Sequence, residues 1–251
     1  MRKDLFQNYF KTQTYKKGKN FITTPPQDYK DYYDVGSWGE HAHVTKSYSG
    51  MGGYKEKAYR RMKAKDQISW LINNGGWDIK SLLEVGCGTG NFLYVAKRKG
   101  KQVTGVEPHP ESNIISIWIT KEKINEKLGQ VEGKHDLVFL SHVLEHFKEP
   151  EKEMPKIKEF CGKLIFVEVP CCDNPRVLRH SIEKNPHITH FTEEGLKEFV
   201  EDQGFKVIIT ETMRTLGKGF DAWMNFYLKN KPMYVNEEAE HAEVIRVLAR
   251  V

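Results

Sequence analysis

Histidines and a carboxylate gather at two points of the 251-residue sequence. The string H-x-x-E-H places His142, Glu145 and His146 directly after a predicted strand, and His187 and His190 precede a predicted helix. An imidazole gains and loses its proton near neutral pH, so each histidine is a candidate general base, with His190 or His187 preferred. In the alternative interpretation, His187 caps a turn and His190 packs under the helix.

The same side chains have the types and the spacing of a metal site. His142, Glu145 and His146 occupy adjoining positions of one turn, and His187 could add a fourth ligand. Imidazole ligands shift the preference from Mg²⁺ towards Zn²⁺, Mn²⁺ or Fe²⁺. In the competing interpretation, which we prefer at this point, Glu145 and His146 pair with each other or with the backbone and no metal binds.

A glycine-rich turn follows a short apolar run. Leu82, Leu83 and Val85 lead into three glycines at alternate positions, and residues 91–98 are compatible with a helix. The order strand, glycine turn, helix opens a nucleotide-binding α/β unit, where glycine lets a ligand approach the backbone closely. The spacing lacks the third glycine of the dinucleotide fingerprint G-x-G-x-x-G, and the Gly-Lys-Ser/Thr end of a P-loop is absent.

An acidic residue follows the next predicted strand. Residues 103–106 form a short apolar run that ends at Glu107 and Pro108. A carboxylate can accept hydrogen bonds from both hydroxyls of a ribose, and the distance from the glycine turn suits the second strand of a nucleotide-binding fold. Glu107 therefore supports a nucleotide-binding fold without deciding which nucleotide binds.

Apolar periodicity and breaker residues predict the elements that position these groups. We expect helices at residues 54–74, 91–99, 151–160 and 193–203, the last with Thr192 as its N-cap. We expect strands at residues 81–85, 103–108, 135–140 and 162–169.

Other stretches are harder to interpret. Residues 113–120 are apolar and β-rich, which predicts an early third strand, followed by a small helix at 121–128. Residues 171–185 are expected to be a polar stretch. The last two strands are expected at 205–210 and 222–228, and a closing amphipathic helix at 235–251.

Two motifs carry a resemblance to a known family. Glu84 with Gly86, Gly88 and Gly90 resembles the E/D-x-G-x-G-x-G motif of class I S-adenosylmethionine (SAM)-dependent methyltransferases. Residues 136–146 resemble the D-h-h-h-h-x-x-V-L-E-H element of ubiquinone-biosynthesis and of sugar and small-molecule methyltransferases. Residues 187–192 resemble the H-h-x-x-F-(S/T) opening of a helix in the same enzymes. The resemblance covers about residues 82–205 and leaves the N-terminal part uncovered.

The resemblance implies an α/β fold with a Rossmann-like, seven-stranded, mostly parallel sheet and helices on both faces. Residues 55–251 would form the methyltransferase domain, and residues 1–54, which are aromatic and polar, would pack on it as a lid. SAM would be the cofactor, with the loop backbone holding its methionine part and Glu84 placed towards its ammonium end. The implied SAM site comprises Glu84, Gly86, Cys87, Gly88, Gly90, Asn91, Phe92, Glu107, Pro108, Thr120, Ser141 and His142.

The resemblance also bears on catalysis and on the metal. It implies that the proton-transfer groups are drawn from His190, His187, His146 and Glu145. The small-RNA 2′-O-methyltransferases hold a divalent ion through E-x-x-E-H and a distant histidine, and this sequence is similar, with His142 in place of the first glutamate. The candidate ligands remain His142, Glu145, His146 and His187.

The expected activity is O-methylation of a polar small molecule, such as a sugar, a nucleotide-sugar or a phosphoryl-bearing metabolite. The alternatives are C-methylation of a keto-sugar, metal-assisted 2′-O-methylation of RNA ribose, and a non-catalytic SAM-binding module that acts through a partner. Enzymes of the keto-sugar type usually carry an N-terminal cysteine zinc module, which this sequence lacks. An NAD-dependent enzyme is remote because the glycine spacing is wrong.

Composition limits the partners. The net charge of +5 is mild and the cations are scattered, so an anionic small molecule is favoured and nucleic acid is not indicated. The four cysteines include no C-x-x-C pair, which argues for a reducing compartment and against a cysteine zinc site. Without an apolar targeting segment or a membrane-spanning run, we expect a cytoplasmic protein that does not bind membranes.

Overall fold

The computed structural model describes residues 14–23, 50–183, 187–217 and 219–251. Most of the predicted N-terminal lid therefore lies outside the described residues. The described part is a hairpin of β1 (Thr14–Lys17) and β2 (Asn20–Thr23). Strand β2 pairs antiparallel with β8 (Thr189–His190), with Phe21 opposite His190. This hairpin thus lies against the segment that carries two of the candidate histidines, and the division at residue 54 stays a prediction.

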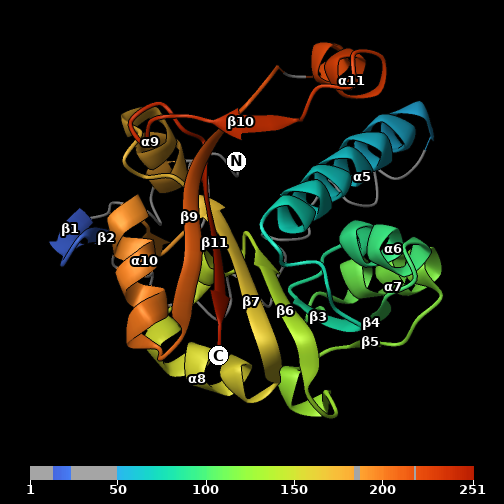
Figure 1. Ribbon diagram of the computed structural model, residues 1–251, viewed down its shortest axis with the longest axis horizontal. Coiled ribbons are helices and arrows are strands. Elements are labelled where there is room, and N and C mark those ends of the chain that lie inside the picture. Colours follow the sequence, from blue (N-terminus) through green and yellow to red (C-terminus); the bar gives the residue numbers. More distant parts are fainter. Residues whose placement is uncertain (1–13, 24–49, 184–186, 218) are drawn as a thin grey trace, which may run out of the picture.

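An eight-stranded sheet forms the centre of the molecule (Figure 1), in the order β10-β9-β11-β7-β6-β3-β4-β5. Strands β3 to β7 pair parallel, and β9, β10 and β11 pair antiparallel at one side. The prediction of a Rossmann-like, mostly parallel sheet is confirmed, with eight strands rather than seven. The strands are β3 (Ser81–Val85), β4 (Gln102–Val106), β5 (Ile124–Asn125), β6 (His135–Ser141), β7 (Cys161–Pro170), β9 (Lys206–Thr215), β10 (Tyr234–Asn236) and β11 (Val244–Arg250).

Helices cover both faces of this sheet, as predicted. In Figure 1, α5, α6 and α7 lie on one side, and α8 and α10 lie on the other. Helix α5 already begins at Gly50, four residues before the expected start. Among the residues that the structure describes, none of the helices combines the length and the apolar character needed to cross a membrane. The helices are α5 (Gly50–Asn73), α6 (Asn91–Arg98), α7 (Pro110–Thr120), α8 (Pro150–Glu159), α9 (Pro175–Glu183), α10 (Glu193–Asp202) and α11 (Gly219–Tyr227), with 3₁₀ turns η1 (Leu128–Gln130) and η2 (Leu144–His146).

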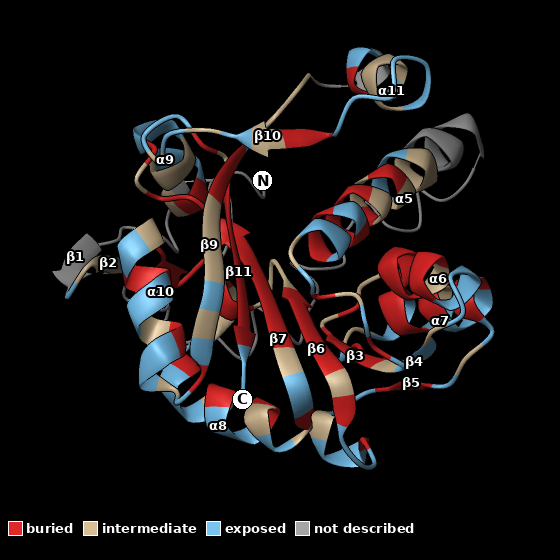
Figure 2. Cartoon of the chain, viewed as in Figure 1, coloured by how far each residue is buried: buried red, intermediate tan, exposed pale blue. Residues whose placement is uncertain are grey.

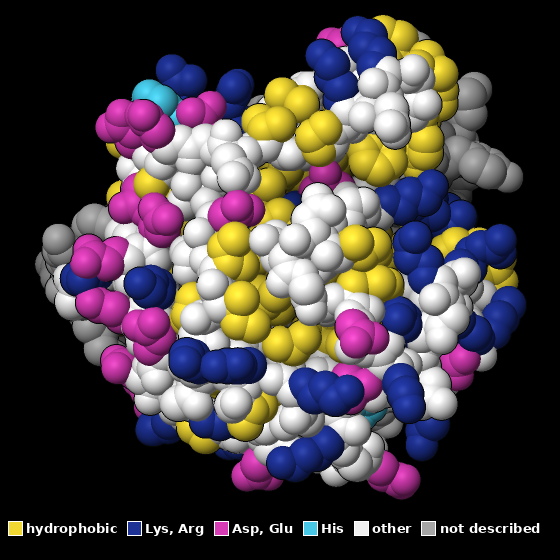
Figure 3. Space-filling view, in the orientation of Figure 1, with side chains coloured by type: hydrophobic (Ala, Val, Ile, Leu, Met, Phe, Trp, Pro, Cys, Tyr) yellow, Lys and Arg dark blue, Asp and Glu magenta, His cyan; other side chains and the backbone are white. Residues whose placement is uncertain are grey.

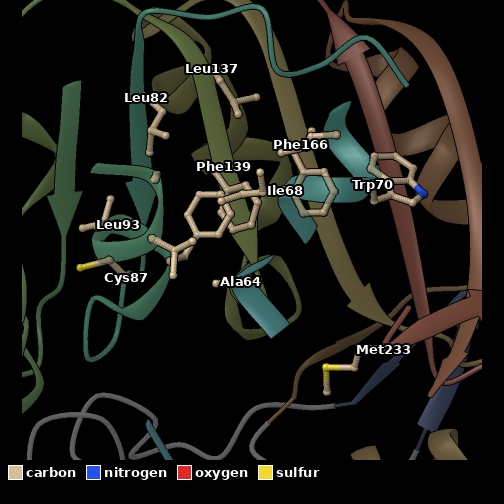
Figure 4. Close-up of a cluster of buried hydrophobic side chains, with 14 of the residues drawn as sticks. Ala64, Ile68, Trp70, Leu82, Cys87, Leu93, Leu137, Phe139, Phe166 and Met233 are labelled. Atoms are coloured by element: carbon tan, nitrogen blue, oxygen red, sulfur yellow. The ribbon is translucent and has the colours of Figure 1, made fainter. Parts of the chain in front are cut away.

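Stacked aromatic rings join α5 and α6 to the sheet. Phe92 on α6 stacks on Phe139 of β6 at 3.7 Å between ring centroids, and Phe139 stacks on Phe166 of β7 at 4.6 Å. Trp70 on α5 meets the edge of Phe166 (Figure 4). The central strands are buried on both faces (Figure 2), as parallel strands between two helix layers must be. This rigid core fixes the strand ends that carry the candidate site.

The predicted early strand at 113–120 is wrong, because these residues belong to helix α7. The helix begins as helix starts do, with Pro110 in the first turn and the His109 side chain accepting a hydrogen bond from the backbone of Ser112. Its buried face is mostly small and polar, whereas Ile114 and Trp118 are exposed. Because the polar residues are buried and large apolar residues are exposed, the sequence pattern wrongly indicated a strand. The small helix predicted at 121–128 is also wrong: β5 and η1 lie there.

The predicted C-terminal elements are wrong as well. Residues 222–228 fall mainly in helix α11, and residues 235–251, expected as a helix, contain β10 and β11. Six of the seven residues of β11 are buried, including Arg246, which resembled the polar face of a helix. The expected polar stretch at 171–185 contains helix α9. Elsewhere the predicted strands and helices are confirmed within a few residues, including the Thr192 cap, whose hydroxyl accepts from the backbone of Gly195.

Candidate active site

The candidate site lies at the carboxyl ends of the parallel strands. Strand β3 pairs with β4 on one side and β6 on the other, and the chain order reverses there. Val85, at the end of β3, is level with Val106 of β4 and Leu140 of β6. In open α/β sheets, ligands bind beyond the strand ends at such a switch point. The glycine turn, Glu107 and the residues after β6 therefore meet at one edge of the sheet.

The three glycines of the loop all have positive φ, but they serve different purposes. An added Cβ on Gly86 would lie 2.5 Å from Cγ2 of Val143, and one on Gly90 would lie 2.2 Å from Oγ of Ser116. At Gly88, an added Cβ would meet no other described heavy atom within 4 Å. Gly86 and Gly90 are therefore required by close packing, and Gly88 leaves open space in which a ligand can approach the backbone.

Two buried carboxylates adjoin this loop. Glu107 accepts hydrogen bonds from the backbone N–H of Gly88 at 2.7 Å and of His109 at 2.9 Å. Glu84 is 6% exposed, and its Oε2 has no hydrogen-bond partner among the described residues. Burial raises the pKa of Glu107 and raises that of Glu84 further, only partly offset by hydrogen bonds from backbone N–H groups. Burial therefore disfavours the ionised form of both carboxyl groups at this edge of the site.

Most of the other predicted SAM-site residues near the loop are buried. Cys87 is buried, with Sγ 3.6 Å from Oγ of Ser116, and Phe92 packs in the core. Asn91 donates to Oγ1 of Thr89 at 2.9 Å. Thr120 is buried, and its hydroxyl donates to the carbonyl of Ser116 at 2.8 Å. Pro108 is exposed beyond Glu107.

Sequence reasoning missed two residues on this side. Ser116 lies on the face of α7 that packs against the loop, with its Oγ 3.6 Å from Sγ of Cys87 and 2.2 Å from where a Cβ on Gly90 would lie. Asn125 ends β5, and its carbonyl accepts from the backbone N–H of Glu107 at 2.8 Å. Because β5 is only two residues long, no apolar run marked it. With β5 as the third strand, Asn125 and the exposed Glu126 follow Glu107 along the strand ends.

The histidines and Glu145 come together at the end of β6. His142 has φ +56°, an uncommon conformation for a residue other than glycine. Its Nδ1 lies 3.2 Å from Oε1 of Glu145, and Nε2 of His187 lies 3.9 Å from the same oxygen. The rings of His146 and His187 meet edge-on at 4.6 Å. The backbone N–H of Ile188 donates to the carbonyl of Glu145 and ties the two segments together.

Helix α9 adds a residue that sequence reasoning missed. Oγ of Ser181 lies 2.7 Å from Nδ1 of His187 and 2.9 Å from Nδ1 of His190. Burial lowers the pKa of His187 to about 3 and that of His190 to about 4, so both rings are neutral at pH 7. Burial alone would raise the pKa of Glu145, but His142 and the neighbouring histidines lower it to about 2. The cluster thus contains an ionised carboxylate, and the imidazoles of His187 and His190 in it are neutral.

A buried ion-pair network adjoins the cluster. Glu168 on β7 is fully buried and pairs with Lys63 at 2.8 Å and with Nε of Arg246 at 2.7 Å. Arg246 also pairs with Asp66 at 3.0 Å, and Ser141 donates to Glu168 at 3.0 Å. Nε2 of His142 lies 3.4 Å from Glu168. His142 therefore lies between two buried carboxylates, and its pKa is raised because these contacts outweigh burial and the repulsion from Lys63.

The comparisons with known proteins agree with this arrangement. A family model described as "Methyltransferase domain" matches residues 54–210, more than half of the chain. The chain belongs to this family. A comparison with curated protein sequences gives no significant match.

Solved structures of similar fold are also methyltransferases. Magnesium protoporphyrin IX methyltransferase from Synechocystis PCC 6803, with bound SAH, is 13% identical with a TM-score of 0.57, covering 88% of this chain and 96% of that one. A SAM-dependent methyltransferase from Thermotoga maritima, described as a possible histamine N-methyltransferase, is 15% identical with a TM-score of 0.60, covering 85% and 99%. The plantazolicin methyltransferase is 10% identical with a TM-score of 0.58, covering 88% and 93%. At this level of identity, the likeness shows the fold, and with the family match it confirms the prediction of a class I SAM-dependent methyltransferase.

Proposed function

We propose that this methyltransferase transfers the methyl group of SAM to an oxygen atom of a polar small molecule, of the sugar, nucleotide-sugar or phosphoryl-bearing class. The observation that carries the proposal is the juxtaposition of two sites at one sheet edge. A glycine loop with buried carboxylates lies at the end of β3 and β4, and the neutral imidazoles of His187 and His190 belong to the histidine cluster beyond β6. The first suits a cationic nucleoside cofactor, and the second suits removal of a proton.

The loop residues fit SAM. When bound, SAM supplies a methyl group on a positively charged sulfonium. Gly88 gives backbone access, and Glu107 lies where a carboxylate can accept from ribose hydroxyls. The unpaired Oε2 of Glu84 supports a positively charged ligand on this side, because a buried carboxylate without a partner is unfavourable. Asn125 and Glu126, at the end of the third strand, are the proposed adenine side.

The hydroxyl of Ser181 constrains which histidine can act as base. A hydroxyl has one proton and two lone pairs, so Ser181 donates to at most one Nδ1 and accepts an N–H from at least one of the two rings. At least one of the two neutral rings therefore donates from Nδ1 to Ser181 and has its lone pair on Nε2. Burial lowers the pKa of His187 to about 3, and Glu145, 3.9 Å from its Nε2, offsets only part of that effect. We assign the general base to this His187–Ser181–His190 unit in the metal-free protein.

An anionic acceptor fits the surface charge. On the face in Figure 3, Lys and Arg side chains are mixed with acidic ones along the lower edge and gather more densely on the right, over α5, α6 and α7. The chain carries a net charge of +5. The similar structures are named for different acceptors, magnesium protoporphyrin IX and plantazolicin among them. They support no particular acceptor for this chain.

Calorimetry and a turnover assay test the proposal. We expect micromolar binding of S-adenosylhomocysteine (SAH) without binding of NAD, and SAH release from SAM with a panel of sugar, nucleotide-sugar and phosphorylated acceptors. His187→Ala and His190→Ala should retain SAH binding, and at least one should lower turnover by about 10²–10⁴-fold. His180→Ala, an exposed position on α9, is the matched control. Absence of SAH binding would refute the cofactor assignment, and unchanged turnover in both variants would refute the base. Turnover only with keto-sugar or RNA substrates would refute the acceptor class.

A further inference from the structure

The four predicted metal ligands lie close together in the structure. Three of them have potential ligand atoms near enough to one another to hold one metal ion. One ligand atom each from Glu145, His146 and His187 lies within 4.8 Å of the others. His142, the fourth, lies three residues before Glu145 on the same segment, and its Nδ1 is 3.2 Å from the same carboxylate. We propose that Glu145, His146 and His187 form a binding site for a divalent first-row transition ion, with Zn²⁺ or Fe²⁺ preferred over Mg²⁺.

The carboxylate is the first reason. Glu145 is 1% exposed, and its Oε2 has no hydrogen-bond partner among the described residues. A buried carboxylate oxygen without a donor is costly unless a cation completes its surroundings. His142 contacts only the other oxygen, so Oε2 remains available to a metal ion.

The imidazoles are the second reason. Metal-bound histidines usually direct their second nitrogen to a hydrogen-bond acceptor that fixes the ring. Nδ1 of His187 is 2.7 Å from Oγ of Ser181, which leaves Nε2 on the side of Glu145. Metal–nitrogen and metal–oxygen bonds of about 2.0–2.2 Å require ligand atoms roughly 3.5 Å apart. The three side chains therefore need to close by about 1 Å around the ion.

The ligand types decide the class of metal. Two imidazoles and one carboxylate suit zinc and iron, whereas Mg²⁺ prefers oxygen ligands and retains its water. Three protein ligands leave coordination positions open for water or an acceptor oxygen, as in catalytic zinc sites. An ion here would lower the pKa of a bound hydroxyl and could replace the imidazole base proposed for the metal-free protein.

The chain offers an internal control. Glu238, Glu240 and His241 also have atoms within ligand distance of one another, but all three are exposed. Exposed carboxylates stay hydrated and gain little from an ion. If ligand spacing alone decided binding, this exposed group and the buried cluster would bind alike.

The test measures metal binding without turnover. The full chain, stripped with EDTA, is titrated with Zn²⁺ against a chromophoric chelator, and Co²⁺ is added as a probe of nitrogen and oxygen ligands in visible absorption. We expect one tight equivalent of Zn²⁺, weakened at least about 100-fold in Glu145→Gln and His146→Ala. Ser181→Ala should weaken it about 10-fold by releasing His187. His241→Ala should bind as the parent does.

Circular dichroism and SAH binding show that each variant is folded. His146 is half-exposed on a short turn, so His146→Ala keeps the test decisive if Glu145→Gln fails to fold. Lack of a tight equivalent in the parent, equal binding of Mg²⁺, or binding that is lost with His241 and kept without Glu145 or His146 would overturn the site. SAH binding by the metal-free protein would leave the proposed function standing in each of these cases.

Discussion

Glu84 and Glu107, beside the glycine loop, and Glu145 and Glu168, beside the histidines, are all less than a tenth exposed. Their pKa values nevertheless shift in opposite directions. Burial raises the pKa of the loop carboxyl groups, because the backbone N–H groups that are their main partners offset only part of the effect of burial. At the other end, burial is outweighed for Glu168 by Lys63 and Arg246, and for Glu145 by the histidines, so both pKa values fall.

Glu168 and Glu84 are the two extremes: the chain itself supplies cations to Glu168, and it leaves one oxygen of Glu84 without a partner. Glu168 has its cations supplied by α5 and β11, so its charge is satisfied in the folded protein. Glu84 has an oxygen without a partner, and we attribute its remaining charge compensation to a cationic cofactor. The first arrangement should control folding, and the second should control binding.

The largest expected effect comes from disrupting the ion-pair network around Glu168. Arg246→Met removes a buried cation from both Asp66 and Glu168, of which Glu168 keeps Lys63, and it should lower the free energy of unfolding by about 3–5 kcal/mol. Urea unfolding followed by circular dichroism measures this change. Arg250→Met, an exposed position of the same strand, should stay within about 0.5 kcal/mol of the parent. Equal stability of the two variants would show that the network does not hold the fold.

Two neighbouring glycines separate packing from binding. Gly90→Ala forces a Cβ against Ser116 and should destabilise the protein by about 2–4 kcal/mol. Gly88→Ala has open space and should lose only about 1–2 kcal/mol, from its positive φ. SAH affinity should nevertheless fall at least tenfold in Gly88→Ala, measured by calorimetry on the folded variant. If Gly88→Ala binds SAH normally, the open space is not the cofactor's.

The smallest expected effect on stability tests whether the pKa of Glu84 is raised in the folded protein. A folded-state pKa above the unfolded value of about 4.3 means that folding is penalised once the pH rises above that value. Glu84→Gln should therefore match the parent near pH 4 and be more stable by about 1–2 kcal/mol at pH 8. Urea midpoints at the two pH values give the comparison, and SAH binding should weaken in the same variant. A parent that is the more stable protein at pH 8 would contradict the assignment.

Local patterns predicted the parts of the fold that depend on local chemistry. The apolar run before the glycines gave β3, and Thr192 gave the start of α10, because a cap uses only neighbouring residues. Helix α7 was missed because it buries small polar residues such as Ser116 to fit the loop. Strand β11 was missed because the partners of Arg246 lie 78 and 180 residues away.

The candidate site follows the same rule. The sequence brought out Glu145 and His187 as chemical candidates, and the fold places them 3.9 Å apart. The sequence did not indicate Ser181, because the surrounding stretch has no clear periodicity. It did not indicate Glu168 either, because that residue fits the predicted strand like its neighbours. Their roles depend on residues from other elements. The roles of the predicted SAM-site, catalytic and metal residues remain predictions for the experiments above.

Strand β11 has a consequence for the order of folding. It lies between β7 and β9, both of which precede it in the chain, so these two strands cannot pair with each other. Until residues 244–250 insert, both strands present open edges, and unpaired edges recruit other chains. A nascent protein released before that insertion should aggregate or engage chaperones. Sheet closure is then a slow, non-local step, governed by the last strand to enter.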